Sequence, residues 1–490
     1  MSELATGRNL MMSHEQDEQA AIVTATTTNE NERTTTEKQP TMIEAPIYVD
    51  IIIPAHNASL TIDATIHSAF AAQTSLPPHF DVVVCCYDDG STDDTHDKLL
   101  CLQTTYSDHK LRVGTSTASR GAGYARNRAV ALRDNRHGGD QDRHFLCLLD
   151  SDDTMHPNRI MEQVYHHMMA LSPPQRHATI LGCRFDRHPP DATWHYAQWA
   201  NGLTDERIML ERYREVTILQ PTWVLTKHRF HQLGGYVEAP DDDDTFDVHS
   251  YQLFAPPNNQ LRLVHTTFET RQTMRLAEDL RLLYAHLHDH GRLALHRGMP
   301  LVTYRHVPGM TQSSQTSRKL LLHLRVLALE LAVLSQWKTG FVVWGAGRDG
   351  KDFVKALTPD MRSKICCFVD VDHKKIDAGY YANKQIGVKI PIVHYSHLIK
   401  DEALRNKIQE SDQDPHFGRI QKGAVPPKSS QPPPMKRKKV LQQQASSLDM
   451  TTLPNLPVIV CVAMYRTGGA LEANVASIGR TEGEDLWHLS

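Results

Sequence analysis

The chain has 490 residues, a formal net charge of −4, 40% hydrophobic residues and eight cysteines. This length predicts about three domains, and the small net charge excludes a general electrostatic attraction to nucleic acid or to anionic membranes. The cysteines have no metal-ligand spacing, and most lie in strand-like apolar runs, which is typical of buried thiols in a reducing compartment.

The N-terminal segment, residues 1–45, is rich in Thr, Glu, Asn and Gln, and we expect it to be disordered. It lacks the apolar core of a signal peptide, and no uncharged apolar stretch of the chain reaches membrane-spanning length. We therefore expect a cytoplasmic protein without a membrane partner. The sequence does not indicate an oligomeric state.

The first ordered part reads as a strand–helix–strand unit. Val49–Ile53 is an apolar run followed by Pro54 and Asn57, and helical spacing spans residues 59–73. The second strand, residues 82–87, ends in an Asp-Asp-Gly-Ser turn that contains Asp89. Polar side chains are therefore predicted at the ends of both strands, although an ordinary polar loop has the same composition.

Three carboxylates follow the next apolar run. Phe145–Leu149 predicts a buried strand, and Asp150, Ser151, Asp152 and Asp153 come directly after it. In open α/β sheets ligands bind at the carboxyl ends of the strands. Clustered carboxylates repel one another, and Mg²⁺ or Mn²⁺ would relieve that repulsion. The alternative is an acidic turn that caps a helix.

These segments, together with Gly121–Asn127, Gly234–Tyr236 and Glu278–Leu280, resemble glycosyltransferase family 2 in order and spacing. The resemblance implies a GT-A domain over residues 46–316, with a mixed, mainly parallel sheet and flanking helices. It implies inverting transfer of a hexose from a UDP-sugar to an acceptor hydroxyl, with Mn²⁺ or Mg²⁺ as cofactor.

The resemblance also implies roles for single residues. Asp89 would bind the nucleotide base, Asp150 and Asp152 the sugar nucleotide and its metal, and Asp279 would be the catalytic base. His306 is a further candidate metal ligand, and Arg305 a cation that could pair with phosphate. The remaining candidates for the nucleotide-sugar site are Pro54, Asn57, Arg126, Asn127, Ser151 and Asp153.

The chemistry independently requires a base, because an acceptor hydroxyl is a poor nucleophile until a carboxylate takes its proton. Asp279 opens an expected helix that runs to about His288, where an acidic residue could equally be favoured by the helix dipole. The connection before it, residues 236–277, is longer than is usual in the family and carries Asp241–Asp244, which we interpret as a solvated loop.

The C-terminal part is predicted to be a smaller, Rossmann-like α/β domain. A linker helix is expected over residues 317–339, followed by a domain over residues 340–490. A strand leads into Gly345–Gly350, and Asp370 follows about twenty residues later, which matches a dinucleotide fingerprint. Because the unit is short and interrupted, we favour a structural or acceptor-positioning module over a dinucleotide site.

A polar segment, residues 397–452, interrupts this domain and is expected to be a disordered insertion. Its basic tetrad, Lys436–Lys439, could be a nuclear address or a tether to nucleic acid. We favour the interpretation as solvated charge.

Several further segments resemble one branch of the family, which transfers galactose from UDP-galactose to queuosine in cytosolic tRNA. They are residues 199–204, 221–223, 368–376 and 467–469. A tRNA acceptor would need stacking platforms, and Trp194, Trp199 and Trp223 are candidates, with a place in the buried core as the equal alternative. The alternatives are an N-acetylglucosaminyltransferase acting on a glycan or protein, and a non-catalytic protein that binds a nucleotide sugar or a dinucleotide.

Overall fold

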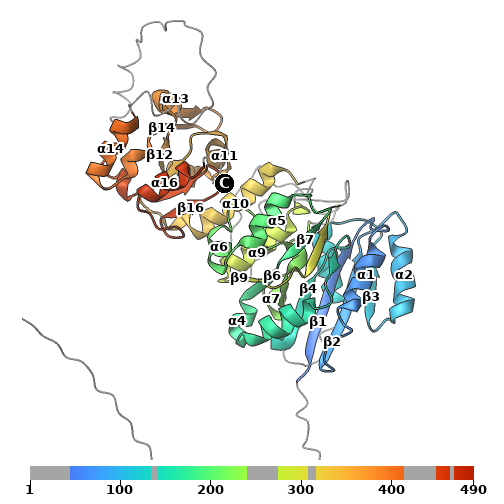
Figure 1. The fold of residues 1–490 in the computed structure, drawn as a ribbon. Helices are drawn as coiled ribbons and strands as arrows, with labels where there is room; N and C mark the ends of the chain where they lie inside the picture. The colour runs from blue at the N-terminus through green and yellow to red at the C-terminus, as the bar shows by residue number, and fades with distance from the viewer. Residues whose placement is uncertain (1–44, 134–140, 240–273, 307–315, 413–448, 464–467) are drawn as a thin grey trace, which may run out of the picture. The chain divides into compact units, whose positions relative to one another are not determined.

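The computed structural model describes residues 45–133, 141–239, 274–306, 316–412, 449–463 and 468–490 (Figure 1). Three segments about which the sequence made predictions lie outside the described residues: the N-terminal tail up to residue 44, the acidic run Asp241–Asp244, and the basic tetrad Lys436–Lys439.

The first sheet has seven strands in the order β3-β2-β1-β4-β8-β6-β9. Strands β3, β2, β1 and β4 are parallel, β8 is antiparallel to β4 and β6, and β6 is parallel to β9. The sheet is thus mixed and mainly parallel, as the sequence predicted. The strands are β1 (Ile47–Ala55), β2 (Phe80–Asp88), β3 (Leu111–Thr115), β4 (His144–Leu148), β6 (Thr179–Cys183), β8 (Val224–Thr226) and β9 (Arg292–His296).

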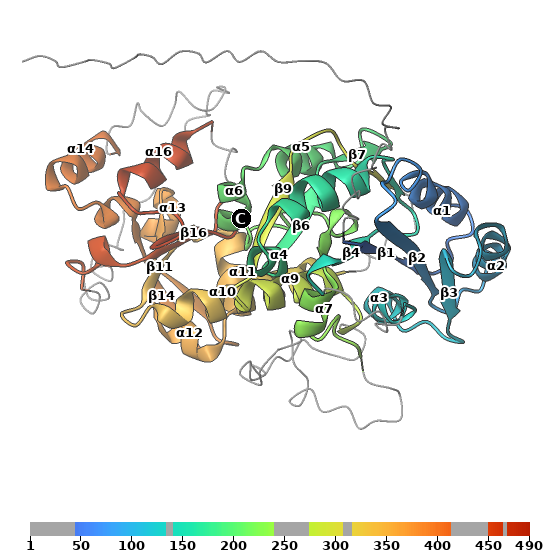
Figure 2. The same ribbon diagram turned by 90° about the horizontal axis from the view of Figure 1, so that it is seen from below.

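Helices cover both faces of the parallel strands. The helices α1 (Ile62–Ala71) and α2 (Thr95–Tyr106) lie on one face, and α3 (Ala122–Ala131) lies on the other (Figures 1 and 2). Successive residues of a strand point to opposite faces. Accordingly, Ile51 packs in the core that contains α1 and α2, whereas Ile52 packs in the core that contains α3. This two-sided burial explains why these strands are almost uninterrupted apolar runs.

One buried charge breaks the apolar run of β1. The side chain of Asp50 is fully buried and contacts three basic groups. Arg133 Nη1 lies 2.9 Å from Asp50 Oδ1, and His144 Nε2 and Lys227 Nζ lie 2.9 and 3.0 Å from Oδ2. Burial opposes ionisation of Asp50, but these three neighbours outweigh it and hold its pKa below the ordinary value. We call this cluster of four residues the Asp50 network.

A small three-stranded sheet borders the carboxyl end of β4, in the order β5-β10-β7. Its strand β5 begins directly after Asp153 and pairs antiparallel with β10, which pairs parallel with β7. The strands are β5 (Thr154–Met155), β7 (Phe185–His188) and β10 (Val302–Arg305). The helices of this half are α4 (Pro173–His177), α5 (Trp194–Gly202), α6 (Asp205–Leu210), α7 (Lys227–Gln232) and α9 (Glu278–His288), with a π-helix at Met161–His167.

The C-terminal sheet has six strands in the order β13-β14-β12-β11-β15-β16, all parallel except for the antiparallel edge strand β13. Its strands are β11 (Phe341–Trp344), β12 (Ile365–Asp370), β13 (Tyr380–Asn383), β14 (Val388–His394), β15 (Val458–Val460) and β16 (Leu486–His488). The helices are α10 (Arg318–Ala332), α11 (Arg348–Ala356), α12 (Pro359–Ser363), α13 (His373–Asp377), α14 (Glu402–Asp412) and α16 (Ala470–Ser477).

The position of α14 corrects one prediction, because it is a helix inside residues 397–452, which were expected to be disordered. Arg405 explains part of the difference, since its guanidinium donates to the carbonyl of Ile399 and so ties the helix to the preceding turn. Among the described residues, no helix is both long enough and apolar enough to cross a membrane.

Candidate active site

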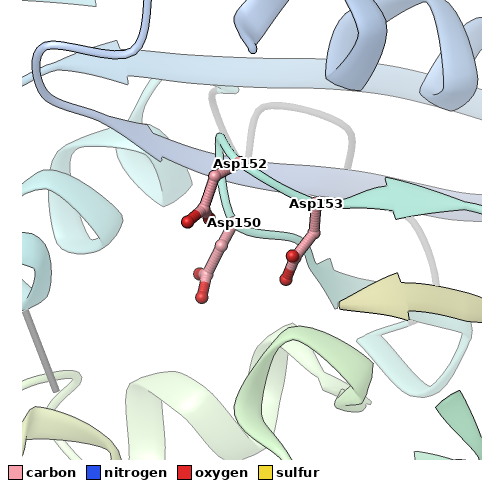
Figure 3. A group of neighbouring side chains, drawn as sticks. All are labelled: Asp150, Asp152 and Asp153. Carbon is pink, nitrogen blue, oxygen red and sulfur yellow. The ribbon is translucent and has the colours of Figure 1, made fainter. Parts of the chain in front are cut away.

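The carboxylates of Asp150, Asp152 and Asp153 gather in the turn between β4 and β5. Their oxygens lie within 4.8 Å of one another, and the three side chains point to the same side of the turn (Figure 3). Burial and the charge of Asp150 raise the pKa of Asp152 to about 6. Burial and the charges of Asp152 and Asp150 raise the pKa of Asp153 well above its ordinary value. The three side chains therefore resist being charged together.

These residues fit a divalent cation, because oxygen ligands at this spacing suit Mg²⁺ or Mn²⁺ and a cation would remove the repulsion that raises the two pKa values. Asp153 Oδ2 supports this fit, since it is a buried oxygen without a hydrogen-bond partner. His306 is exposed at the end of β10 and is not part of this group of three. Its proposed ligand role stays a prediction.

The turn itself is held by two residues from distant parts of the chain. Thr65 Oγ1, on α1, donates to the carbonyl oxygens of Ser151 and Asp153 at 2.9 and 2.7 Å. The backbone N–H of Arg305 donates to Asp153 Oδ1 at 2.8 Å, and its guanidinium donates to the carbonyl of Asp152. Arg305 thus braces the turn, and its predicted pairing with phosphate stays a prediction.

Asp89 lies at the end of β2, as predicted, and is 2% exposed. Its carboxylate accepts hydrogen bonds from Ser119 Oγ at 2.8 Å and from the backbone N–H groups of Arg120 and Gly121 at 3.0 and 2.8 Å. Both oxygens therefore hold the loop that leads into α3. The predicted contact with a nucleotide base is not tested by this geometry.

Pro54 and Asn57 close the end of β1. Pro54 is buried within the strand, whereas Asn57 is exposed and has a left-handed φ of 50°. Asn57 Oδ1 accepts the N–H of Thr92 at 2.8 Å, and the Asn57 N–H donates to Ser91 Oγ at 2.8 Å. Asn57 therefore links the carboxyl end of β1 to the turn after β2, next to the loop that Asp89 holds.

Arg126 and Asn127 are neighbours on α3 but serve different partners. Arg126 is 3% exposed, and its Nη2 and Nη1 lie 2.6 Å from Asp150 Oδ1 and 2.7 Å from Glu278 Oε1. Asn127 faces the loop after Gly235, where its Nδ2 donates to the carbonyl of Tyr236 at 2.9 Å and to Glu238 Oε1 at 2.7 Å. The structure therefore brings Arg126, but not Asn127, to the carboxylates.

Asp279 occupies the first turn of α9, as predicted. Burial and the adjacent charge of Glu278 raise its pKa to about 7, while the N–H of Leu280, 2.8 Å from Asp279 Oδ1, and the charge of Arg126 act in the opposite direction. A carboxyl group with a pKa near neutrality is well matched to general-base work. The Arg126–Glu278 pair places the start of this helix beside Asp150.

Two contributors to the site were not assigned these roles from the sequence. Thr65 lies 86 residues from Ser151 and gives no local signal, because a threonine in a helix is ordinary. Glu278 was named only as part of the segment that resembles the family, whereas in the structure it is the partner of Arg126. A buried arginine with carboxylates on two sides is a tertiary arrangement, and no local motif encodes it.

The three tryptophans that the sequence offered as stacking platforms differ in how deeply they are buried. Trp223 is fully buried and donates to the carbonyl of Ile218 at 3.0 Å, so it is a core residue and cannot be a stacking platform. Trp199 is partly buried and donates to Glu211 Oε2 at 2.9 Å. Trp194 is 49% exposed, and its ring stacks on His195 with a centroid separation of 3.7 Å.

Comparison with known proteins places this site in a class. A family model described as Glycosyl transferase family 2 matches residues 50–233, which include Asp89, Arg126 and the carboxylate cluster but not Asp279 or Arg305. These residues of the chain are therefore similar to glycosyltransferase family 2. Together with the mixed, mainly parallel sheet and its flanking helices, this match gives the fold as GT-A-like α/β.

Among its relatives, the β-1,3-glucosyltransferase WfgD of Escherichia coli, named for UDP-Glc and α-D-GlcNAc-diphosphoundecaprenol, is 34% identical over 116 residues. Chondroitin synthase of Escherichia coli is 36% identical over 120 residues. Each match covers 24% of this chain, and they span 39% and 15% of the two relatives.

Among solved structures, TarS residues 1–349 of S. aureus in complex with UDP-GlcNAc aligns with a TM-score of 0.36 and 14% identity. This alignment covers 65% of this chain and 84% of the TarS chain.

Proposed function

We propose that this protein is an inverting, metal-dependent glycosyltransferase that moves a hexose from a UDP-sugar to an acceptor hydroxyl. One observation carries the proposal: a cluster of three carboxylates that fits a divalent cation is joined, through Arg126, to the helix that carries a carboxyl group with a pKa of about 7. A transferase needs both elements, one for the leaving diphosphate and one for the acceptor.

In the proposed reaction, Asp279 takes the proton of the acceptor hydroxyl. The acceptor oxygen forms a bond to the anomeric carbon, and the bond from that carbon to the UDP oxygen breaks with its electron pair leaving on UDP. A divalent cation held by Asp150 and Asp152 would supply positive charge against the departing diphosphate. A single displacement of this kind inverts the anomeric configuration and needs one base and no carboxylate nucleophile.

For the donor, the name of the E. coli glucosyltransferase supports a UDP-sugar. For the particular sugar and acceptor, we propose galactose and the queuosine base of cytosolic tRNA. The support is the resemblance of residues 199–204, 221–223 and 368–376 to that branch of the family. The exposed Trp194–His195 stack on α5 offers a platform of the kind on which splayed RNA bases stack.

The test uses purified protein with Mn²⁺ and labelled UDP-galactose. The acceptor is tRNA from cells supplied with, or deprived of, the queuosine precursor. We expect label only in queuosine-containing tRNA and none with Asp279→Asn. Parallel reactions with UDP-glucose and UDP-N-acetylglucosamine identify the sugar. Equal labelling of both tRNA pools would refute queuosine as acceptor, and failure to release UDP from any of the three donors would refute the transferase itself.

A further inference from the structure

The helix α3 approaches the start of α9 more closely than ordinary side chains allow. A Cβ atom at Gly123 would lie 3.2 Å from the Cβ atoms of both Glu278 and Tyr236. The missing side chain therefore lets the two helices touch at the point where α9 begins. Three residues further along α3, on the next turn, lies Arg126.

Arg126 spans the gap between the donor-side turn and α9. One terminal nitrogen reaches Asp150 at 2.6 Å and the other reaches Glu278 at 2.7 Å, so a single rigid guanidinium holds both carboxylates at once. The side chains of Arg126 and Glu278 are only 4% and 13% exposed, so water screens this pair little. The ion pair of Arg128 with Glu238, formed from the same helix, is 41% and 27% exposed and is a natural control.

No side chain of the preceding residue caps the start of α9, where the N–H of Leu280 bonds Asp279 Oδ1 and Arg281 Nε donates to the carbonyl of Leu276. The residue before the helix, Ala277, has a left-handed φ of 54° and offers no side-chain cap. Helix N-termini without a capping side chain leave backbone N–H groups unsatisfied and are prone to fray. Asp279 follows Glu278 directly, so any fraying of this turn would displace the candidate base.

We propose that Glu278 is a positioning residue that acts through Arg126 to hold Asp279 at a fixed distance from the donor carboxylates. In this view Arg126 is a structural link between the donor and acceptor sides of the site and not a contact to the nucleotide sugar. The inference rests on the proposed transferase function, and it assigns Glu278 no proton transfer of its own.

The test compares Glu278→Gln, Arg126→Met, Arg126→Lys and the double variant Arg126→Met/Glu278→Gln, with Arg128→Met as the matched control. Release of UDP from UDP-galactose is measured with Mn²⁺ and queuosine-containing tRNA, and kcat and the donor KM are determined separately. Hydrogen exchange of the amides of Arg281, Leu282 and Leu283 reports on the first turns of α9 without depending on turnover.

We expect Arg126→Met to lower kcat about 10²-fold, the size expected for an ångström-scale displacement of a catalytic group. Glu278→Gln keeps the acceptor oxygen and loses the charge, and should lower kcat about tenfold. The kcat of Arg126→Lys should lie between those of these two variants, because an ammonium cannot hold two carboxylates in the same planar geometry.

The double variant should have a kcat no lower than that of Arg126→Met, since the two residues act as one unit. The donor KM should stay within about threefold in every variant, because only positioning for the chemical step is lost.

Exchange at the start of α9 should accelerate in Arg126→Met and not in Arg128→Met. Normal turnover in Glu278→Gln, or a double variant whose loss is the product of the two single losses, would overturn the proposal. A large rise in donor KM at constant kcat would do the same and return Arg126 to donor binding. If the unmodified protein released no UDP, the transferase proposal would fail, while unchanged exchange in Arg126→Met would still decide against the positioning role.

Discussion

At the scale of single residues, the protonation state of Asp279 decides whether the site can act as a base. Replacing it with asparagine keeps the shape of the side chain and removes its ability to accept a proton. We expect Asp279→Asn to lower kcat about 10²-fold or more, the usual effect of losing a general base, with donor affinity preserved. Steady-state kinetics and calorimetric titration with UDP test this, and the exposed Asp186→Asn on β7 is the control. Near-normal turnover would place the base elsewhere.

In the proposed reaction, with Asp279 as the base, the raised pKa of this residue predicts a defined pH dependence. Because the base works as a carboxylate and its pKa is about 7, about a tenth of it is active at pH 6 and about nine-tenths at pH 8. At saturating donor and metal, kcat should therefore rise through neutrality and level off at alkaline pH. Glu278→Gln removes a neighbouring negative charge and should move this rise to lower pH. A kcat that stays constant between about pH 5.5 and about pH 8 would contradict the assignment of Asp279 as the base.

The carboxylate cluster should bind Mn²⁺ more weakly as the pH falls below about 6, because Asp152 then takes up a proton that competes with the metal. Calorimetric titration of the protein with Mn²⁺ at two pH values measures this directly. Asp152→Asn should abolish the binding, whereas Asp97→Asn, in the first turn of α2, should leave it unchanged. Full activity in excess chelator would refute the metal.

At the residue scale, the clustering of the three carboxylates is confirmed, because it depends on local sequence. Asp150, Asp152 and Asp153 follow one apolar strand, so their clustering could be predicted from consecutive positions. The orientation of Asp89 and Arg305 could not, since each faces backbone groups of segments that are distant in sequence. For Trp223 the sequence left a stacking role and a core role equally open, because nothing in its neighbours Pro221 and Thr222 reveals that the ring fills the core.

At the scale of elements, the Asp50 network joins strands β1 and β4 to α7. Asp50→Asn would leave Lys227 as a buried charge without its carboxylate partner and Arg133 with only Asp81, and breaking a buried ion pair costs about 3–5 kcal/mol. We expect a corresponding drop in the free energy of unfolding, measured by urea titration at pH 7. Asp360→Asn, at a side chain that is 75% exposed, should change it by less than about 1 kcal/mol.

The same network makes an acid-sensitive contribution. Because the folded-state pKa of Asp50 is lowered, its stabilising effect is complete above the ordinary value of 3.8 and is lost as the pH falls through the folded-state value. The unfolding free energy of the unmodified protein should therefore approach that of Asp50→Asn as the pH falls through the folded-state pKa of Asp50. A constant difference down to the lowest pH at which the protein stays folded would exclude this linkage.

Element prediction worked best for long apolar strands and less well for short ones. The strands β1, β2 and β4 could be predicted from the sequence, because burial of both faces makes them continuous apolar runs. The small sheet of β5, β7 and β10 escaped prediction, because its strands have two to four residues and its pairing joins distant parts of the chain. The helix α14 was missed because its polar sequence resembles the disordered composition around it.

At the scale of the whole molecule, both large sheets have a carboxylate at a strand end, and the one in the C-terminal sheet is hydrogen-bonded within its own domain. Asp370, the acidic residue of the dinucleotide fingerprint, accepts hydrogen bonds from the N–H groups of Ala346 and Asp372 and from Lys375 Nζ, at 2.8, 3.0 and 2.9 Å. Its carboxylate is thus committed to its own sheet. We expect no binding of NADH in equilibrium dialysis at concentrations where UDP with Mn²⁺ binds. Saturable NADH binding that is lost in Asp370→Asn would show that the carboxylate is available after all.

The uneven exposure of the tryptophans has a practical optical consequence. Of the six indoles in the chain, Trp223, Trp344 and Trp487 are at most 4% exposed, whereas Trp194 is 49% exposed. An aqueous collisional quencher such as iodide will therefore reach Trp194 most readily, and the quenchable part of the intrinsic emission will come mainly from the start of α5. The fluorescence of Trp194 can therefore report the binding of a ligand at this surface without an added label.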